Sequence, residues 1–313
     1  MTSAVPLRFG INIDPTAGDL ALPFARAAIA DRTGLDLIAL QDHPYNRRML
    51  ETWTLLSMLA ARTGRVHLLT NVANTPLRPP AMLAKQTATL DLLSGGRFEL
   101  GIGAGAYWAG IAAYGVDERS AGESYRAFKE ALTIIRGMLE HANGAFSYNG
   151  EYYRVRGARP GPGPDHVVPI WTGAVGPRML RLSGRMADGV IVSYTYVPPE
   201  KLAALNDAID EGAAQANRSP AAIRRGYNLM GAIAPSSAGI KAESGLVGPP
   251  ERWVDTILAL HHESRMDTFI FWPVVGDEER QIAVFAEEVV PAVRAALDGS
   301  PQPAKDQTAW PKR

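Results

Sequence analysis

An acidic and a basic side chain stand next to each other at the end of an apolar run in the first fifty residues. The run LDLIALQ covers residues 35–41, and Asp42 and His43 follow it directly. Imidazole changes its charge near neutral pH, and an adjacent carboxylate raises the imidazole pKa and fixes the ring. The pair therefore predicts proton transfer to or from a bound molecule, with Asp42 and His43 as catalytic residues. Asp42 as a turn cap and His43 as a partner of a loop carbonyl remain alternatives.

Polar residues and glycines follow several other apolar runs. Together with Asp42 and His43, the residues predicted to line a binding site are Asn71, Val72, Asn74, Gly103, Gly105, Ala174, Val175, Gly176 and Ser193. Gly176 begins a predicted helix, where free backbone amides favour a phosphate group. Turns and loops without a ligand are the alternative interpretation. The histidines include no pair at i, i+4 spacing, so we expect no metal site, and no G-x-S-x-G motif points to a hydrolase.

These positions are placed by apolar runs that alternate with amphipathic segments along the chain. Strands are predicted at 7–13, 35–41, 66–72, 97–103, 168–173, 188–194, 224–234 and 267–273, and helices at 19–32, 51–63, 80–94, 124–141, 176–186, 199–217, 249–264 and 278–297. Alternation of this kind predicts a (β/α)8 TIM barrel, in which the carboxyl ends of the strands carry the active site. A doubly wound sheet is the structural alternative.

Two insertions and a tail interrupt this pattern. Residues 142–165, after strand four, contain two aromatic runs around Asn149 and Gly150 and predict a hairpin. Residues 235–248, after strand seven, are small, polar and glycine-rich, and predict a mobile lid loop. We expect a single barrel domain over residues 1–298 and a disordered tail over residues 299–313.

Composition limits the class of protein. The 313 residues carry 32 basic and 32 acidic side chains and no cysteine, which argues against nucleic acid binding, disulfides and thiolate catalysis. No apolar segment reaches the roughly 18 residues of a spanning helix, so we expect no membrane contact. No secretory signal is visible, which predicts a cytoplasmic location. Helix 51–63 carries a wide apolar surface, including Trp53, Leu55, Leu56, Met58 and Leu59, which favours a homodimer or packing in the core.

Three longer segments carry a resemblance to a known family. TATLDLLSGGRFELGIGAG (87–105), TGAVGPRML (172–180) and ADGVIVSY (187–194) resemble the luciferase-like flavin-dependent oxidoreductases, over nearly the whole chain. The resemblance implies a (β/α)8 barrel that holds FMN or the deazaflavin coenzyme F420 at the carboxyl ends of its strands, together with a small-molecule substrate. It also implies a cis peptide bond between Asn71 and Val72, which would press a bulge against the cofactor ring.

The choice of cofactor depends on the pair at the end of strand two. Asp42 and His43 are similar to the pair in the F420-dependent branch, which implies hydride transfer between coenzyme F420 and a small organic substrate. That branch commonly presents basic side chains to the cofactor phosphate, whereas SYTYVPP (193–199) after strand six has none. An FMN-dependent monooxygenase is therefore the first alternative, and a non-catalytic flavin-binding barrel is the second.

Overall fold

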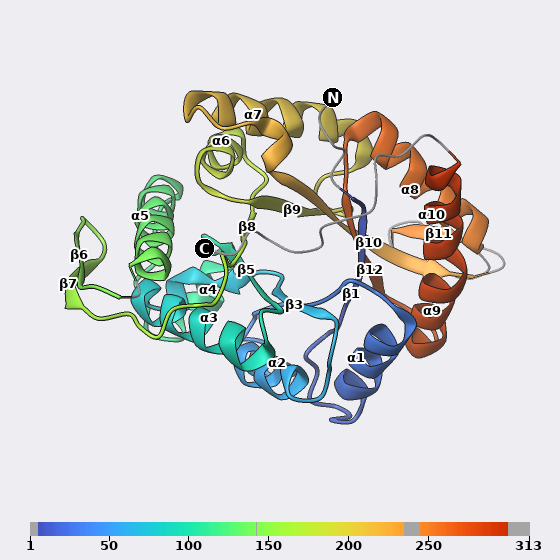
Figure 1. Cartoon of the computed structure of the whole chain (residues 1–313), viewed down its shortest axis with the longest axis horizontal. Coiled ribbons are helices and arrows are strands. Elements are labelled where there is room, and N and C mark those ends of the chain that lie inside the picture. Colours follow the sequence, from blue (N-terminus) through green and yellow to red (C-terminus); the bar gives the residue numbers. More distant parts are fainter. Residues whose placement is uncertain (1–5, 142, 235–244, 300–313) are drawn as a thin grey trace.

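Eight parallel strands form a closed barrel at the centre of the protein (Figure 1). The computed structural model describes residues 6–141, 143–234 and 245–299. β12 pairs with both β10 and β1 and so closes the barrel, which confirms the (β/α)8 architecture and excludes the open doubly wound sheet. In order around the barrel the strands are β1 (Arg8–Asn12), β2 (Leu37–Leu40), β3 (His67–Thr70), β5 (Phe98–Gly103), β8 (Ile170–Gly173), β9 (Gly189–Ser193), β10 (Arg224–Ile233) and β12 (Thr268–Pro273).

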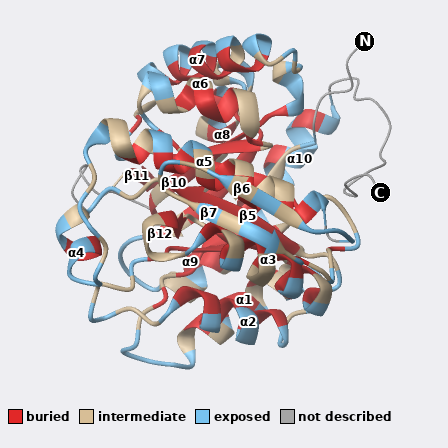
Figure 2. Cartoon of the chain, turned by 90° about the vertical axis from the view of Figure 1, so that its left-hand side faces the viewer, coloured by how far each residue is buried: buried red, intermediate tan, exposed pale blue. Residues whose placement is uncertain are grey.

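Helices surround the barrel (Figure 1), and their buried faces pack against the strands (Figure 2). A capping box between Ser120 and Glu123 begins α5 at Ala121, earlier than the predicted start at residue 124. Residues 285–289 form a π-helical turn that joins the last two helices. The helices are α1 (Leu22–Thr33), α2 (Thr52–Ala60), α3 (Pro80–Ser94), α4 (Trp108–Ala112), α5 (Ala121–Glu140), α6 (Pro177–Met186), α7 (Leu202–Gln215), α8 (Pro250–Ser264), α9 (Glu278–Val284) and α10 (Val290–Asp298).

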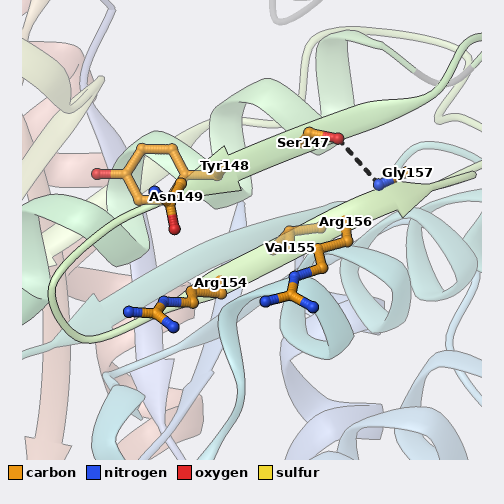
Figure 3. Close-up of a pocket in the computed structure, with 7 residues that line it drawn as sticks. All are labelled: Ser147, Tyr148, Asn149, Arg154, Val155, Arg156 and Gly157. Carbon is orange, nitrogen blue, oxygen red and sulfur yellow. Dashed lines mark hydrogen bonds between the residues drawn. The ribbon is translucent and has the colours of Figure 1, made fainter.

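The insertion after α5 is the predicted hairpin. β6 (Phe146–Asn149) and β7 (Arg154–Ala158) pair antiparallel, and the carboxylate of Glu130 accepts hydrogen bonds from the backbone amides of Glu151, Tyr152 and Tyr153 in the turn. A shallow surface pocket of about 380 Å³ lies on this hairpin (Figure 3). The hairpin connects the end of α5 to the start of β8, and its turn packs against the first half of α5, where Arg126 pairs with Glu151 at 3.0 Å.

The predicted lid after strand seven is only partly described. Residues 235–244 lie outside the described residues, and so do residues 300–313 of the predicted tail. The prediction of a loop through residue 248 is wrong at its end, because Leu246–Gly248 form β11, which pairs parallel with the extended end of β10. Apolar Leu246 and Val247 are buried there, and strand pairing satisfies their backbone groups. Within the described ranges no helix is long and apolar enough to cross a membrane.

The apolar surface of α2 is used mainly inside the chain. Trp53, Leu55, Leu56 and Leu59 are all buried, and Met58 alone among the five apolar residues of that prediction is exposed, at 45%. Core packing therefore explains the width of this surface, and the homodimer stays a prediction, as does the cytoplasmic location.

A buried ion pair closes the amino-terminal end of the barrel. The carboxylate of Glu99 is 2% exposed and accepts hydrogen bonds from Arg8 at 2.6 and 3.1 Å and from the indole of Trp171 at 2.7 Å. His67 lies 3.0 Å from the same carboxylate. Burial would raise the pKa of Glu99, but Arg8 and His67 outweigh burial and hold it well below its usual range. This end of the barrel is filled by structure, which leaves the carboxyl end for a ligand.

Candidate functional site

The predicted site residues come together at the carboxyl ends of the strands. Asn74, in the short strand β4 (Ala73–Asn74), donates its backbone N–H to Asp42 at 2.8 Å. A side-chain network connects Asn71 to Ser193. The loop after β8 places Ala174, Val175 and Gly176 at the same end, before α6. The parallel barrel therefore brings together side chains that are far apart in the sequence.

Asp42 is bound on both oxygens by an arginine that the sequence analysis did not identify. Arg78 donates Nε to Asp42 Oδ2 at 2.7 Å and Nη2 to Oδ1 at 2.8 Å, and it also reaches Glu51 at 2.5 Å. The carboxylate of Asp42 is fully buried. These carboxylates raise the pKa of Arg78 and more than offset its burial, so the guanidinium stays charged. Asp42 therefore fixes the backbone of Asn74 and the position of Arg78.

His43 points in a different direction from Asp42. Its ring is exposed, and Nδ1 lies 2.8 Å from the hydroxyl of Tyr45. Desolvation by the surrounding site lowers the pKa of His43, and the nearby charge of Asp42 raises it by less. Asp42 raises the pKa of His43 as expected, but desolvation outweighs it, and the ring is hydrogen-bonded to Tyr45 instead of Asp42. Successive side chains in an extended segment point to opposite sides, which separates these two neighbours.

Amide and hydroxyl side chains form a network across the barrel. Asn71 donates to Asn228 Oδ1 at 2.8 Å, and Asn228 donates to Ser193 Oγ at 2.9 Å. Asn71 also lies 3.4 Å from Asn12 Oδ1. Asn228, in the middle of β10, is 3% exposed. The network joins four barrel strands or their carboxyl ends and presents neutral donors and acceptors to this end of the barrel.

Val72 fills the space that neighbouring glycines leave open. The Asn71–Val72 peptide bond is cis, as predicted. A β-carbon at Gly103 would lie 2.8 Å from Val72 Cγ2, and one at Gly173 would lie 2.9 Å from it. Gly105 has a φ of +86° and faces Pro76 and Ile111 in the same way. Gly103 and Gly173 therefore permit the close approach of the Val72 bulge, and Gly105 permits that of Pro76 and Ile111.

The loop after β8 ends at an open helix N-terminus. Gly176 is the N-cap of α6 and has no capping side chain, and a β-carbon there would meet nothing within 4 Å. Ala174 is buried, whereas Val175 is 63% exposed. Unsatisfied amides at the start of a helix suit an anionic group. A phosphate at this position stays a prediction.

Three buried polar atoms near Asp42 have no hydrogen-bond partner. They are Gln41 Oε1, Asn74 Oδ1 and Thr75 Oγ1. Buried polar atoms are normally paired, so unpaired ones at a strand end indicate a place where a polar ligand contributes the missing bonds. Together with the open amides at Gly176, they fit a large cofactor with amide-like ring edges and a phosphate. The described residues include no group of histidine and carboxylate side chains that could hold a metal ion.

Three residues of this site were missed by the sequence analysis. No sequence pattern pointed to Arg78, because its spacing from Asp42 does not correspond to any local motif. Asn228 is a polar residue inside the apolar run RRGYNLMGAIA (224–234), and that mismatch could have identified it. Tyr45 follows His43 by two positions and could have been considered as its partner.

Comparisons with known proteins identify relatives of this chain. The chain is 32% identical over 213 residues to 5,10-methylenetetrahydromethanopterin reductase of Archaeoglobus fulgidus, covering 68% of this chain and 60% of that protein. It is 32% identical over 229 residues to an F420-dependent glucose-6-phosphate dehydrogenase of Microbacterium testaceum, covering 69% and 65%. The chain therefore matches less than two thirds of the length of these relatives.

A solved structure shows the same fold. An F420-dependent secondary alcohol dehydrogenase in complex with an F420–acetone adduct superposes with a TM-score of 0.82 at 19% identity, covering 93% of this chain and 100% of the other. The profile of the luciferase-like monooxygenase family matches residues 5–281. The chain belongs to the luciferase-like monooxygenase family.

Proposed function

We propose that this protein is an oxidoreductase that uses coenzyme F420 to transfer a hydride to or from a small organic substrate. The observation that carries the proposal is the position of His43, an exposed imidazole hydrogen-bonded at Nδ1 after β2, at the same end of the barrel as the Val72 bulge and the amide network. The F420-dependent relatives support the choice of cofactor. Coenzyme F420, when bound, supplies the two-electron chemistry.

The residues that would hold the cofactor come from four strand ends. Val72, between Gly103 and Gly173, would support one face of a flat ring. Asn71, Asn228 and Asn74 Oδ1 would meet polar ring edges, and the amides at the start of α6 would meet the phosphate. These neutral groups match the absence of a lysine in SYTYVPP (193–199). In this proposal, backbone amides and side-chain amides bind the cofactor in place of basic side chains at its phosphate.

His43 is the group that we assign to the proton. Its lowered pKa keeps the imidazole neutral at neutral pH, and Nε2 has no partner among the described residues. Nε2 would therefore contact the substrate oxygen and hold or move its proton. Asp42 is a positioning residue, because Arg78 and the Asn74 amide occupy its oxygens. It fixes the segment that carries Asn74 beside His43.

Spectroscopy of a single turnover tests the function. Oxidised F420 would be mixed with the protein and a panel of alcohols, and reduced F420 with the matching aldehydes and ketones. We expect the visible absorbance of F420 to bleach or recover for at least one pair. The FMN-dependent monooxygenase predicts a different result: no change with F420, and oxygen consumption with reduced FMN. A protein that binds either cofactor with no turnover would support the non-catalytic alternative.

A further inference from the structure

We propose that Tyr45 is the positioning residue of His43 and selects the tautomer in which the neutral ring carries its proton on Nε2. This inference deepens the proposed function and rests on it for the role of Nε2 toward substrate. In consequence, the resting protein offers a hydrogen-bond donor at the barrel mouth. That donor fits the carbonyl oxygen of an aldehyde or ketone. We therefore expect the oxidised substrate to be an aldehyde or a ketone.

The contacts of His43 leave Tyr45 as its orienting group. The Tyr45 hydroxyl lies 2.8 Å from Nδ1, a normal hydrogen-bond distance. Asp42 is the neighbouring charge, but both of its oxygens accept from Arg78 and one also accepts from Asn74. The ring is therefore held by a neutral phenol, which does not raise its pKa as a bound carboxylate would.

Residues in and beside α4 hold Tyr45 in place. Gly110 in α4 makes room for the phenol ring, because a β-carbon there would lie 2.7 Å from Tyr45 Cγ. Tyr107 packs edge-on against Tyr45 with ring centroids 5.4 Å apart. The hydroxyl of Tyr114 donates to the carbonyl of Pro44 at 2.6 Å, which ties the turn to the segment after α4. The phenol is thus fixed independently of His43.

The direction of the hydrogen bond follows from the protonation states. Burial, with the charge of Asp42, raises the pKa of Tyr45 above its ordinary value, so the hydroxyl keeps its proton at neutral pH. His43 is neutral there and has one protonated nitrogen. The Tyr45 hydroxyl has two side-chain partners, Asn74 and His43 Nδ1. Asn74 lowers the pKa of Tyr45, as an amide that donates to the hydroxyl oxygen does, which leaves the hydroxyl proton for Nδ1. Nδ1 therefore accepts, and the ring proton is on Nε2.

A neutral imidazole of this kind acts as a fixed donor. Its Nε2–H would polarise a carbonyl oxygen as negative charge develops there, which is a known use of neutral histidine in enzymes. An alcohol, by contrast, needs a base with a free lone pair at the same position. The Tyr45 contact therefore favours carbonyl reduction over alcohol oxidation when His43 is in its resting tautomer.

Nitrogen-15 NMR of histidine-labelled protein tests the tautomer without any cofactor. The His43 signals are assigned by their loss in His43→Ala and recorded above the His43 pKa. We expect wild type to show a protonated Nε2 and an accepting Nδ1. Tyr45→Phe keeps the ring but removes the hydroxyl, so the two tautomers should mix. Tyr148→Phe on the hairpin removes a remote hydroxyl and should leave the His43 signals unchanged.

Kinetics provide the second readout. In Tyr45→Phe, carbonyl reduction at saturation should fall, up to roughly a hundredfold for a misplaced catalytic group. The dissociation constant of the cofactor should stay at the wild-type value. A protonated Nδ1 in wild type, or unchanged His43 signals in Tyr45→Phe, would overturn the inference. Failure of F420 to bind would overturn the proposed function and leave the NMR result to decide the role of Tyr45.

Discussion

Arg78 binds Asp42 through two parallel hydrogen bonds of 2.7 and 2.8 Å, although His43 is the neighbour of Asp42 in the sequence. This ion pair is buried, and Arg78 is connected further to Glu51, the N-cap of α2. The relationship separates two functions at the end of β2. Asp42 stabilises the site, and we propose that His43 acts on a bound molecule.

Removing Arg78 tests the structural role of the pair. Arg78→Ala leaves the Asp42 carboxylate buried without its partner, and we expect a loss of about 3–5 kcal/mol in the free energy of unfolding. Urea unfolding followed by circular dichroism measures the loss. Arg126→Ala is the control, because Arg126 pairs with Glu151 on the surface, where ion pairs contribute little. Equal stability of the two variants would contradict the structural role of Arg78.

Removing the imidazole tests the catalytic role. His43→Ala should lower saturated turnover by about a hundredfold to ten-thousandfold while cofactor affinity stays nearly constant. Asp42→Asn should lower turnover less and stability more, since Asp42 holds Arg78 and Asn74. Turnover at saturating substrate and the cofactor dissociation constant are measured for both. Unchanged turnover in His43→Ala would leave His43 as a wall of the pocket.

A larger residue beside Val72 tests the proposed cofactor support. The added methyl of Gly173→Ala would approach Val72 to 2.9 Å, so we expect about 1–3 kcal/mol of destabilisation and weaker cofactor binding. Gly144→Ala adds the same methyl where the nearest atom lies 4.0 Å away, and serves as the control. Fluorescence titration measures the affinity. Wild-type affinity in Gly173→Ala would remove Val72 from the cofactor site.

Asp91 on α3 gives a pH dependence of stability. Its carboxyl is fully buried, 3.3 Å from His166, and burial raises its pKa to about 7. Since this value lies above the unfolded value of about 3.9, the protonated acid stabilises the fold below about pH 4. That stability is lost as pH rises through about 7, by up to about 4 kcal/mol for a shift of this size.

Substitution isolates this contribution. Asp91→Asn should remove the loss of stability between pH 4 and 7 that wild type shows at this group. Asp117→Asn, on an exposed loop, is the matched control and should follow wild type. Urea midpoints at several pH values provide the comparison. Parallel pH curves for wild type and Asp91→Asn would show that burial does not raise the pKa of this acid.

Local pattern was sufficient to predict the barrel. Apolar runs such as Leu37–Leu40 became strands close to their predicted bounds, because burial on both faces requires continuous apolar sequence. The site was predicted by position, since parallel strands all place their carboxyl ends together. The hydrogen-bond pairs within the site were not predicted. Arg78 contacts Asp42, and Asn228 contacts Asn71, only because folding brings distant parts of the sequence together.

Adjacency in the sequence was misleading at one point. Asp42 and His43 were expected to interact, yet their side chains diverge where β2 ends, and His43 contacts Tyr45 two residues away. The lowered pKa of His43 results from desolvation by residues around it in the folded protein, and the local sequence does not reveal which residues these are.

The most direct measurement of the central claim is a paired titration of the purified protein with oxidised coenzyme F420 and with FMN. Quenching of cofactor fluorescence gives both dissociation constants in one buffer, and competition between the two cofactors shows whether they share a site. The account predicts that F420 binds more tightly than FMN and that excess F420 displaces FMN. Micromolar binding of FMN with no binding of F420 would contradict it.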